Sequence, residues 1–331
     1  MPSDRAHLSV DEARALGERA LRGIGYDDEE ARIVTDHVLD AALCGYEYSG
    51  LAKLLNIPEH RRFKLPRQKM RIVHETAVSA LYDGGNNVGM LAMYRAAEAA
   101  IAKAAAHGIA LVGVTNSWMS GRSAYFVEMI ARAGMVAIHT ASSGGAVAPL
   151  GGARPALGTN PIAFAFPTDD GPFVFDMGTS AFMATELQLR ERLHQKLPEG
   201  VAIDRDGRPT TDPSEARAGA ILPFAGYKGF GLGLVVQAFG VIGGAGLMRS
   251  NGDGYLFIAF RPDLLVPLED AKRELSALIA RIKAVPRLPG VSEIRIPGEN
   301  SARSRERLSR EGIGVDRLVV DSLTQMARNA N

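Results

Sequence analysis

Hydrophobic and polar positions along the chain follow two periods, and the change from one to the other predicts a mixed α/β fold. Over residues 13–21 apolar side chains recur at helical spacing, and Ser9 and Glu12 before them have the spacing of a capping box. A second helix is predicted from the acidic start at 27–30 to about Gly45, because carboxylates favour the positive end of a helix dipole. The N-terminal part of the chain is therefore expected to be helical.

The middle of the chain mixes strand-like and helix-like stretches. An apolar stretch at 73–81 predicts one strand, and the turn at 83–87 leads from it into an Ala-rich helix at 90–107. The polar stretch at 198–217 is too rich in turn residues for a helix and is expected to be an ordered excursion. A last helix is predicted near 315–327. The other predicted elements are strands at 109–114, 135–140, 161–166, 173–175 and 255–260, and helices at 124–133, 229–243 and 268–282.

Composition predicts a globular protein whose partners are small molecules or a second copy of itself. The chain has 331 residues, 46% of them hydrophobic and 23% charged, which is enough to bury a large core. Lys and Arg number 38 against 37 Asp and Glu, so no strong field favours nucleic acid or a membrane surface. The single cysteine, Cys44, excludes an intramolecular disulfide and favours a reducing compartment, with the cytoplasm as the default. We expect neither an export signal nor a membrane anchor.

The familiar nucleotide and metal motifs do not occur in the sequence. The glycine cluster at 229–233 has the wrong third spacing for the dinucleotide motif G-x-G-x-x-G and lies within a helical pattern. Close helix packing is the favoured interpretation of these glycines. A P-loop, a zinc-type H-E-x-x-H and a G-x-S-x-G elbow are also missing, so no metal site is predicted. Any nucleotide must then bind to a fold other than the Rossmann fold.

Several runs of residues resemble the malate/L-lactate dehydrogenase family. The run L-G-T-N-P-I-A-F-A at 157–165, followed by V-F-D-M-G-T-S at 174–180, is similar to the central signature of that family. Order and spacing agree from about residue 8 to about residue 315. The family includes malate and sulfolactate dehydrogenases and reductases of the cyclic imines piperideine- and pyrroline-2-carboxylate. Further similar stretches lie at 197–200, 211–213, 227–232 and 296–299.

The resemblance implies a fold, a cofactor and an assembly. The implied fold is a non-Rossmann one, in which a helical part from both termini surrounds a central α/β layer. Residues 1–72 and 220–331 would form the mainly helical domain, and 73–219 the α/β cofactor-binding domain. The implied cofactor is NADPH or NADH, bound in the cleft, and the implied assembly is a homodimer.

The two positions that carry catalytic histidines in the family are replaced in this chain. By the resemblance, Ser49 stands at the first histidine, Tyr48 at the serine before it and Met119 at the second histidine. A serine cannot serve as a proton donor at neutral pH as imidazole does, and methionine has no proton to give, so a packing role in the pocket is favoured for Met119. His37, on a helical apolar face, is interpreted as a core residue, and His139 at a strand end keeps a functional alternative.

The positions that bind substrate and cofactor in the family are mostly retained. Lys53 stands where the family has an arginine near the substrate carboxylate, although a solvated surface group is the alternative for a lone lysine. Met119 and Thr159 complete the predicted substrate site. A turn or cap role is the alternative for Asp176, which ends an apolar run. The predicted cofactor contacts are Ser143, Asp176, Met177, Gly178 and Lys228.

The missing histidines favour reduction of C=N over reduction of C=O. Hydride transfer to a ketone creates an alkoxide that must be protonated, whereas an iminium ion becomes a neutral amine without an enzyme acid. The leading hypothesis is an NAD(P)H-dependent reductase acting at C2 of a small cyclic imino acid, with Ser49, Tyr48 and Asp176 as catalytic residues. The alternatives are a malate- or lactate-type 2-hydroxy acid dehydrogenase and a cofactor-binding relative that has lost catalysis.

Overall fold

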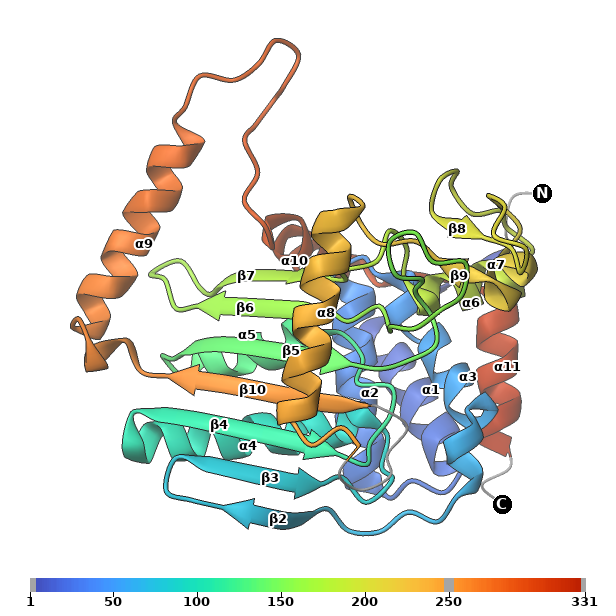
Figure 1. Cartoon of the computed structure of the whole chain (residues 1–331), viewed down its shortest axis with the longest axis horizontal. Coiled ribbons are helices and arrows are strands. Elements are labelled where there is room, and N and C mark those ends of the chain that lie inside the picture. Colours follow the sequence, from blue (N-terminus) through green and yellow to red (C-terminus); the bar gives the residue numbers. More distant parts are fainter. Residues whose placement is uncertain (1–3, 247–252, 329–331) are drawn as a thin grey trace.

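A seven-stranded, mostly antiparallel sheet forms the centre of the computed structural model, which describes residues 4–246 and 253–328 (Figure 1). The strand order is β2-β3-β4-β10-β5-β6-β7, and within this described sheet only the neighbours β3 and β4 run parallel. Its strands are β2 (Arg71–Glu75), β3 (Ser79–Asp83), β4 (Ile109–Thr115), β5 (Val136–Ser142), β6 (Ile162–Phe166), β7 (Phe173–Met177) and β10 (Gly254–Phe260). Two short antiparallel pairs join β1 (Arg5–Leu8) to β11 (Ile313–Asp316), and β8 (Ala202–Ile203) to β9 (Ala220–Ile221).

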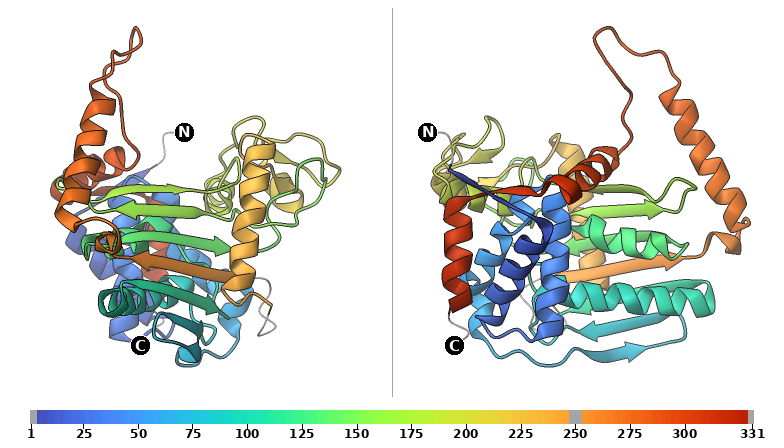
Figure 2. Two further views of the ribbon diagram at one scale, coloured as in Figure 1. Left: turned by 60° about the vertical axis from the view of Figure 1, so that its left-hand side comes forward. Right: turned by 180° about the vertical axis from the view of Figure 1, so that it is seen from behind.

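Helices cover both faces of the sheet and form a separate layer at one end of it (Figures 1 and 2). One face carries α8, packed on β5 and β10, and the other carries α4 and α5. The end layer is built from α1, α2, α3 and α11. The described helices are α1 (Val10–Arg22), α2 (Asp28–Leu43), α3 (Ala52–Glu59), α4 (Gly89–His107), α5 (Ser123–Arg132), α6 (Ala184–Arg192), α7 (Pro213–Ala218), α8 (Tyr227–Ile242), α9 (Leu268–Lys283), α10 (Glu299–Glu311) and α11 (Arg317–Arg328), with 3-10 turns η1 (Glu47–Ser49), η2 (Arg61–Lys64) and η3 (Pro262–Leu264).

The end layer forms because its helices are amphipathic and well capped. The predicted capping box is present at α1, where the Glu12 backbone N–H donates to the Ser9 hydroxyl at 3.2 Å and the Glu12 carboxylate accepts from the Ser9 backbone N–H at 2.8 Å. Asp27 and Glu30 form an equivalent box at α2. The apolar stripes of these helices meet in one buried cluster that also holds residues of α3 and α11. This packing fixes the short connection from α2 to α3, which carries Tyr48 and Ser49.

Close packing explains some, but not all, of the glycines in and just after α8. A Cβ placed on Gly240 would overlap the Ser142 hydroxyl, and one on Gly243 would lie 2.9 Å from the Tyr255 carbonyl carbon, so both allow a close approach to the sheet. In the predicted cluster at 229–233, a Cβ on Gly229 would lie 2.6 Å from the Thr179 carbonyl oxygen, whereas one on Gly231 would meet nothing within 4 Å. The packing interpretation therefore holds for Gly229 and not for Gly231.

Two expectations about individual elements were wrong. The stretch 73–81 was expected to be one strand but divides between β2 and β3, because a turn folds it into an antiparallel hairpin. The polar stretch 198–217 was expected to contain no helix, yet Asp212 caps the short helix α7 through the backbone N–H groups of residues 214 and 215. The helix predicted near 315–327 is α11, which begins at Arg317 after β11 has paired with β1. The strand predicted at 255–260 is β10, and it places part of the segment 220–331 in the middle of the sheet.

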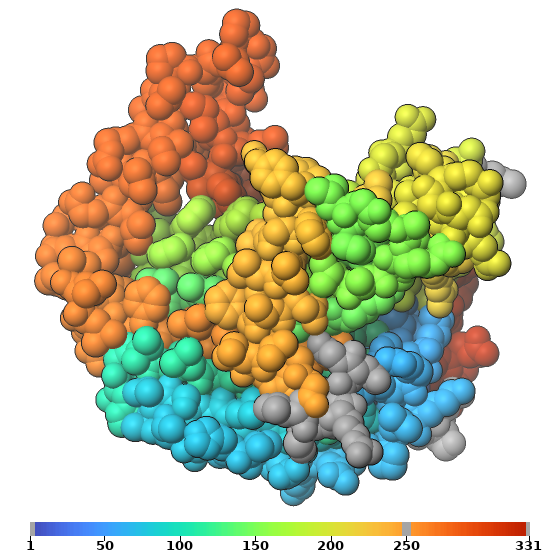
Figure 3. All heavy atoms as spheres, in the orientation of Figure 1, coloured from blue at the N-terminus to red at the C-terminus, as the bar shows by residue number. Residues whose placement is uncertain are grey.

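An arm formed by α9 and residues 284–296 stands out from the body (Figures 1 and 3). No residue of α9 is buried, and apolar side chains of the arm, such as Leu278 and Leu288, are exposed. In Figure 3, α8 lies as a ridge across the visible face beside this arm. None of the described helices is both long and apolar enough to cross a membrane.

Candidate active site

A cavity of about 610 Å³ lies where the end layer meets the sheet, between η1 and α3 on one side and the ends of β5 and β7 on the other. This volume is in the range of sites for small molecules and cofactors. The cavity brings together predicted residues that are far apart in the sequence. Those that line it are Tyr48, Ser49, Lys53, Met119, Ser143, Thr159, Asp176, Met177 and Gly178.

Lys228 is the predicted cofactor contact that does not line this cavity. It lies in the first turn of α8, and its side chain is exposed. Gly226, two residues before it, has a φ of +61°. Its role in cofactor binding therefore stays a prediction.

Tyr48 and Ser49 enter the cavity from the 3-10 turn η1. The turn is held by a hydrogen bond from the Ser49 backbone N–H to the Tyr46 carbonyl at 3.0 Å, and the Ser49 side chain is buried. Burial raises the pKa of Tyr48, and the nearby carboxylate of Glu186 raises it further. Both hydroxyls are therefore protonated and uncharged at neutral pH, so they can orient a ligand by hydrogen bonding.

Lys53 lies in the first turn of α3, and its side chain is buried against the cavity. Only 4% of the residue is exposed. Its ammonium group forms no hydrogen bond or ion pair with another residue of the described chain. Burial lowers the pKa of Lys53 to about 8. The expected positive group is thus present in the site, and it is buried rather than solvated.

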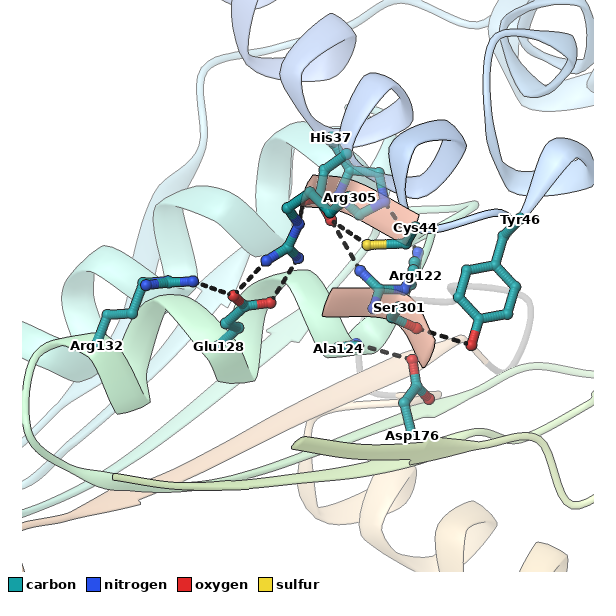
Figure 4. Close-up of polar contacts among 11 residues, drawn as sticks. His37, Cys44, Tyr46, Arg122, Ala124, Glu128, Arg132, Asp176, Ser301 and Arg305 are labelled. Carbon is teal, nitrogen blue, oxygen red and sulfur yellow. Dashed lines mark hydrogen bonds and ion pairs between the residues drawn. The ribbon is translucent and has the colours of Figure 1, made fainter. Parts of the chain in front are cut away.

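Asp176 lies at the end of β7 and points toward the start of α5 (Figure 4). One carboxylate oxygen accepts the Ala124 backbone N–H at 2.8 Å, so the side chain caps a helix of another part of the chain. Burial raises the pKa of Asp176, while the Ala124 hydrogen bond and the charge of Arg122 oppose the rise. The cap interpretation of Asp176 is therefore correct, and the same carboxylate also lines the cavity.

Met119 lies in a loop between β4 and α5 whose backbone is closely fixed. The Trp118 indole N–H donates to the Asn86 carbonyl at 3.1 Å, and Met119 has a φ of +58°. At Gly89 a Cβ would lie 2.6 Å from Ser120 Cα, so helix α4 packs directly on the loop. The thioether of Met119 thus forms a fixed wall of the cavity.

Arg122 is the most important cavity residue that the sequence analysis missed. Its guanidinium group lies 2.8 Å from Asp40 and 5.3 Å from the centre of the Tyr46 ring. Its backbone N–H donates to Nε2 of the buried His37 at 2.9 Å. Arg122 follows the predicted site residue Met119 by three positions, and a positive charge so close to a predicted site residue is the signal that could have indicated it.

The partners of Arg122 belong to a network of buried charges that links α2, α5 and α10 (Figure 4). Arg305 of α10 lies 2.9 Å from Asp40 and donates to both oxygens of Glu128 at 2.8 Å. Burial alone would raise the pKa of Glu128, but the hydrogen bonds and charges of Arg305 and Arg132 lower it to about 2. Arg122, Arg305 and Arg132 therefore share the two carboxylates of Asp40 and Glu128. These ion pairs hold Arg122 at the cavity and leave the network with a net positive charge.

His60 and Asp253 are two further titratable residues of the cavity that the sequence analysis did not select. The His60 ring stacks on Trp118 at 4.3 Å, and its Nδ1 accepts the Arg62 backbone N–H at 3.2 Å. Burial and the charges of Arg61 and Arg62 lower the pKa of His60, so the ring is neutral at pH 7. Burial raises the pKa of Asp253 to about 6 against the opposing charge of Arg62.

The two histidines weighed in the sequence are buried in the core. His139 stacks on Phe257 at 4.0 Å, and its Nδ1 lies 3.2 Å from the Leu256 carbonyl oxygen. Burial lowers the pKa of His139 to about 4. Neither His139 nor His37 lines the cavity. The structural interpretation is favoured for both, and the functional alternative for His139 has no geometric support.

The comparison with known protein families identifies this architecture. The family described as malate/L-lactate dehydrogenase matches residues 8–324. The chain belongs to the malate/L-lactate dehydrogenase family. Members of this family are NAD(P)H-dependent dehydrogenases and reductases.

The chain resembles two kinds of relative over nearly its full length. Some are named for substrates with a C=O group and others for substrates with a C=N group. The malate/(S)-sulfolactate dehydrogenase of Methanothermus fervidus is 33% identical, covering 98% of each chain. The Δ1-pyrroline-2-carboxylate reductase of Ancylobacter novellus is 32% identical, covering 93% of this chain and 94% of the relative. The solved structure of malate dehydrogenase from Pyrococcus horikoshii is 30% identical with a TM-score of 0.86, covering 100% of this chain and 98% of that one.

The residues of one cavity wall fit a nicotinamide nucleotide. Ser143 and Thr159 offer hydroxyl groups, Met177 offers an apolar surface, and Gly144 and Gly178 leave the backbone accessible. A ribose and a carboxamide need hydrogen-bonding groups of this kind, whereas the ring itself packs well against a thioether. The family fold supplies this wall without a glycine-rich phosphate loop.

Proposed function

We propose that the protein is an NAD(P)H-dependent reductase acting at C2 of a small cyclic imino acid of the pyrroline- or piperideine-2-carboxylate type. One observation supports this choice most strongly. Two uncharged side chains, Ser49 and Met119, stand in the cavity where the resemblance places catalytic histidines, while the carboxylate of Asp176 is retained beside them. A buried carboxylate stabilises the positive charge of an iminium ion.

Different cavity residues have different roles in substrate binding and in the reaction. Lys53 and Arg122 supply positive charge toward the substrate carboxylate, and Asp176 supplies negative charge toward the ring nitrogen. Tyr48 and Ser49 are placed to hydrogen-bond the substrate, and Met119 excludes water from its apolar ring. The reduced nicotinamide supplies the hydride when the cofactor is bound.

A malate- or lactate-type 2-hydroxy acid dehydrogenase is the second candidate. The observation that favours it is the presence of two cavity cations, Lys53 and Arg122, which together match a substrate with two anionic groups. The relative from Methanothermus fervidus carries the names of two such substrates, malate and sulfolactate. An imino acid with one carboxylate needs only one of the two cations.

A substrate panel separates these candidates. The measurement is kcat/KM for oxidation of NADH and NADPH with pyrroline-2-carboxylate, piperideine-2-carboxylate, pyruvate, oxaloacetate and sulfopyruvate. We expect a cyclic imino acid to have a kcat/KM at least about tenfold above that of every keto acid, since neither of the two positions where the resemblance places a catalytic histidine carries an imidazole for alkoxide protonation. A higher value for any keto acid contradicts the imine proposal. If calorimetry shows cofactor binding but no substrate is turned over, the result would support the third alternative, a cofactor-binding relative that has lost catalysis.

We also propose that the protein is a homodimer that pairs through α8. The outer side of this helix exposes Tyr227, Leu234, Val235 and Ile242, of which Ile242 is 71% exposed, and no described residue of the same chain covers them. An exposed apolar stripe of this extent is typical of a protein interface. We expect Leu234→Glu to convert the dimer to a monomer in sedimentation velocity.

The control for this prediction is Ile72→Glu on the edge strand β2, where an exposed apolar residue lies outside α8. That variant should sediment as the unaltered protein does. A monomeric parent protein, or a Leu234→Glu variant that remains dimeric, would contradict pairing through α8.

The single cysteine supports a cytoplasmic location. Cys44 is free and buried, beside the Asp40 carboxylate. A free thiol in this position is compatible with a reducing compartment, and we propose the cytoplasm on this ground.

A further inference from the structure

The two cations of the cavity differ in whether they can give up a proton. Arg122 carries a guanidinium group, which stays protonated at every pH at which proteins are folded. Lys53 carries an ammonium group, which becomes a neutral amine when its surroundings disfavour the charge. Of the two cavity cations, Lys53 is therefore the one able to transfer a proton near neutral pH.

The surroundings of Lys53 disfavour its charge. The side chain is buried, and none of the described carboxylates forms an ion pair with it. Removing an unpaired ammonium ion from water is costly, and this cost explains why the pKa of Lys53 falls to about 8. The helices α1 and α11 present apolar core residues to α3 and do not compensate the charge.

The other titratable or charged groups near Lys53 lie on several neighbouring parts of the fold. Tyr48 on η1 is uncharged at neutral pH, because burial raises its pKa. The residue that precedes it, Glu47, pairs with Arg5 at 3.0 Å and does not line the cavity. The groups on the remaining parts are His37 on α2, Arg122 and Asp176 across the cavity, Asp253 before β10, and His60, Arg61 and Arg62 at η2.

Arg122 is better built to hold an anion than to take part in proton transfer. Its guanidinium group is fixed by Asp40 and by the Tyr46 ring, and Asp40 also serves Arg305. Because Asp40 is shared between two arginines, it neutralises Arg122 only in part. The remaining N–H groups of Arg122 suit the planar oxygens of a carboxylate.

We propose that Lys53 is the proton donor of the reaction and that Arg122 anchors the substrate carboxylate. This inference rests on the proposed function, since it assigns roles within the same site. Lys53 at the start of α3 and Ser49 at the end of η1 lie on either side of the bend at Gly50, and both line the cavity.

The proton and electron balance is complete for the imine. The Lys53 ammonium gives one proton to the imine nitrogen, which forms the iminium ion and leaves a neutral lysine amine. A hydride from the reduced nicotinamide adds to C2, the C=N π electrons become the nitrogen lone pair, and the product is a neutral secondary amine. Solvent returns a proton to Lys53. One NAD(P)H and one proton are consumed for each imine reduced, and the cavity never holds an iminium ion beside a charged lysine.

The substitution Lys53→Arg tests this role because it keeps the charge and removes the transferable proton. We expect kcat to fall by about 100-fold or more, the usual range for loss of a general acid, with a KM within about threefold of the original. In the unaltered protein kcat should fall as pH rises through about 8, because the protonated lysine is the active form. This decline should be absent from the variant.

Chemical rescue distinguishes a proton donor from a structural lysine. In Lys53→Ala, methylammonium added to the assay should restore part of kcat, and tetramethylammonium, which has no proton to give, should not. The matched control is Lys64→Arg, an exposed lysine outside the cavity, which should keep its parent activity. Full kcat in Lys53→Arg with an unchanged pH profile would overturn the proposal. A fall in kcat of about 100-fold in His60→Gln, together with full activity in Lys53→Arg, would also overturn the proposal.

The proposal and the proposed function fail in different ways. If no substrate of the panel is turned over, the proposed function fails, and the lysine is then followed directly by nuclear magnetic resonance of its ε-carbon in the cofactor-bound protein. A Lys53 titration near pH 8, absent from Lys53→Arg, supports the donor inference. A titration above pH 10 overturns it, since such a group would not release its proton in the working range.

Discussion

Replacing Gly121 with alanine is expected to lower the free energy of unfolding by about 3 kcal/mol and to reduce activity severely. Gly121 has a φ of +86°, which alanine adopts only with strain. A Cβ at this position would lie 2.8 Å from Cε1 of His37 and still closer to Nε2. His37 is fully buried and stacked on Phe126, so the ring has no space to move into.

The loss of activity follows from the same clash. Displacing His37 breaks its hydrogen bond with the Arg122 backbone N–H, and Arg122 then moves from the cavity. Urea unfolding and kcat/KM measure the two effects. The control is Gly200→Ala, where φ is +74° and an added Cβ meets nothing within 4 Å, so only backbone strain of about 1 kcal/mol is expected.

A double substitution tests whether the clash is the cause. His37→Ala removes the ring and leaves room for the new methyl group, so its effect and that of Gly121→Ala should not add. We expect a coupling of more than about 1 kcal/mol in this double-mutant cycle. Additive effects would show that the methyl group and the ring do not compete for one space.

The substitution Asp176→Asn is expected to lower the rate of hydride transfer by about 100-fold or more. The amide keeps the shape of the carboxylate but carries no charge to stabilise an iminium ion. Its oxygen can still accept the Ala124 N–H that caps α5, so the free energy of unfolding should change by only about 1 kcal/mol. Single-turnover measurement of cofactor oxidation separates this chemical effect from substrate binding.

The control for this prediction is Asp170→Asn, an exposed carboxylate in the turn between β6 and β7. It should leave both rate and stability near their original values. A hydride-transfer rate in Asp176→Asn within about threefold of the original would contradict a catalytic role and leave Asp176 as a helix cap alone.

Local signals predicted much of the helical part of the fold. The Ser9 and Glu12 pair starts α1 as expected, since a capping box depends on four adjacent residues only. The sheet was harder to predict because pairing depends on distant residues. Strand β10 enters between β4 and β5, although more than a hundred residues separate it from either, and no property of its own sequence indicates that place.

The sequence predicted the site residues that belong to recognisable motifs. It missed those that reach the cavity only through the way the chain folds. Ser49, Met119 and Asp176 were found by resemblance, and the fold brings them to one cavity. Arg122 and His60 were missed because neither belongs to a motif. Arg122 reaches the cavity through a loop that is held by a hydrogen bond to His37. His60 follows the short helix α3, which was not predicted because Pro58 interrupts the helical pattern.

The side chains at the two positions where the resemblance places histidines bear on the proposed function. The cavity holds Ser49 and Met119 there, together with the charged side chains of Lys53, Arg122 and Asp176. Such charges can bind a carboxylate, transfer a proton and stabilise a nitrogen cation. They are the basis of the reductase chemistry that we propose.

A competition experiment with labelled cofactor tests the central claim most directly. The protein is given NADPH or NADH carrying deuterium at C4 of the nicotinamide, together with equal concentrations of pyrroline-2-carboxylate and oxaloacetate, and the products are examined by nuclear magnetic resonance. The account predicts deuterium at C2 of proline in at least tenfold excess over C2 of malate. Deuterium found mainly in malate, or in neither product, would contradict it.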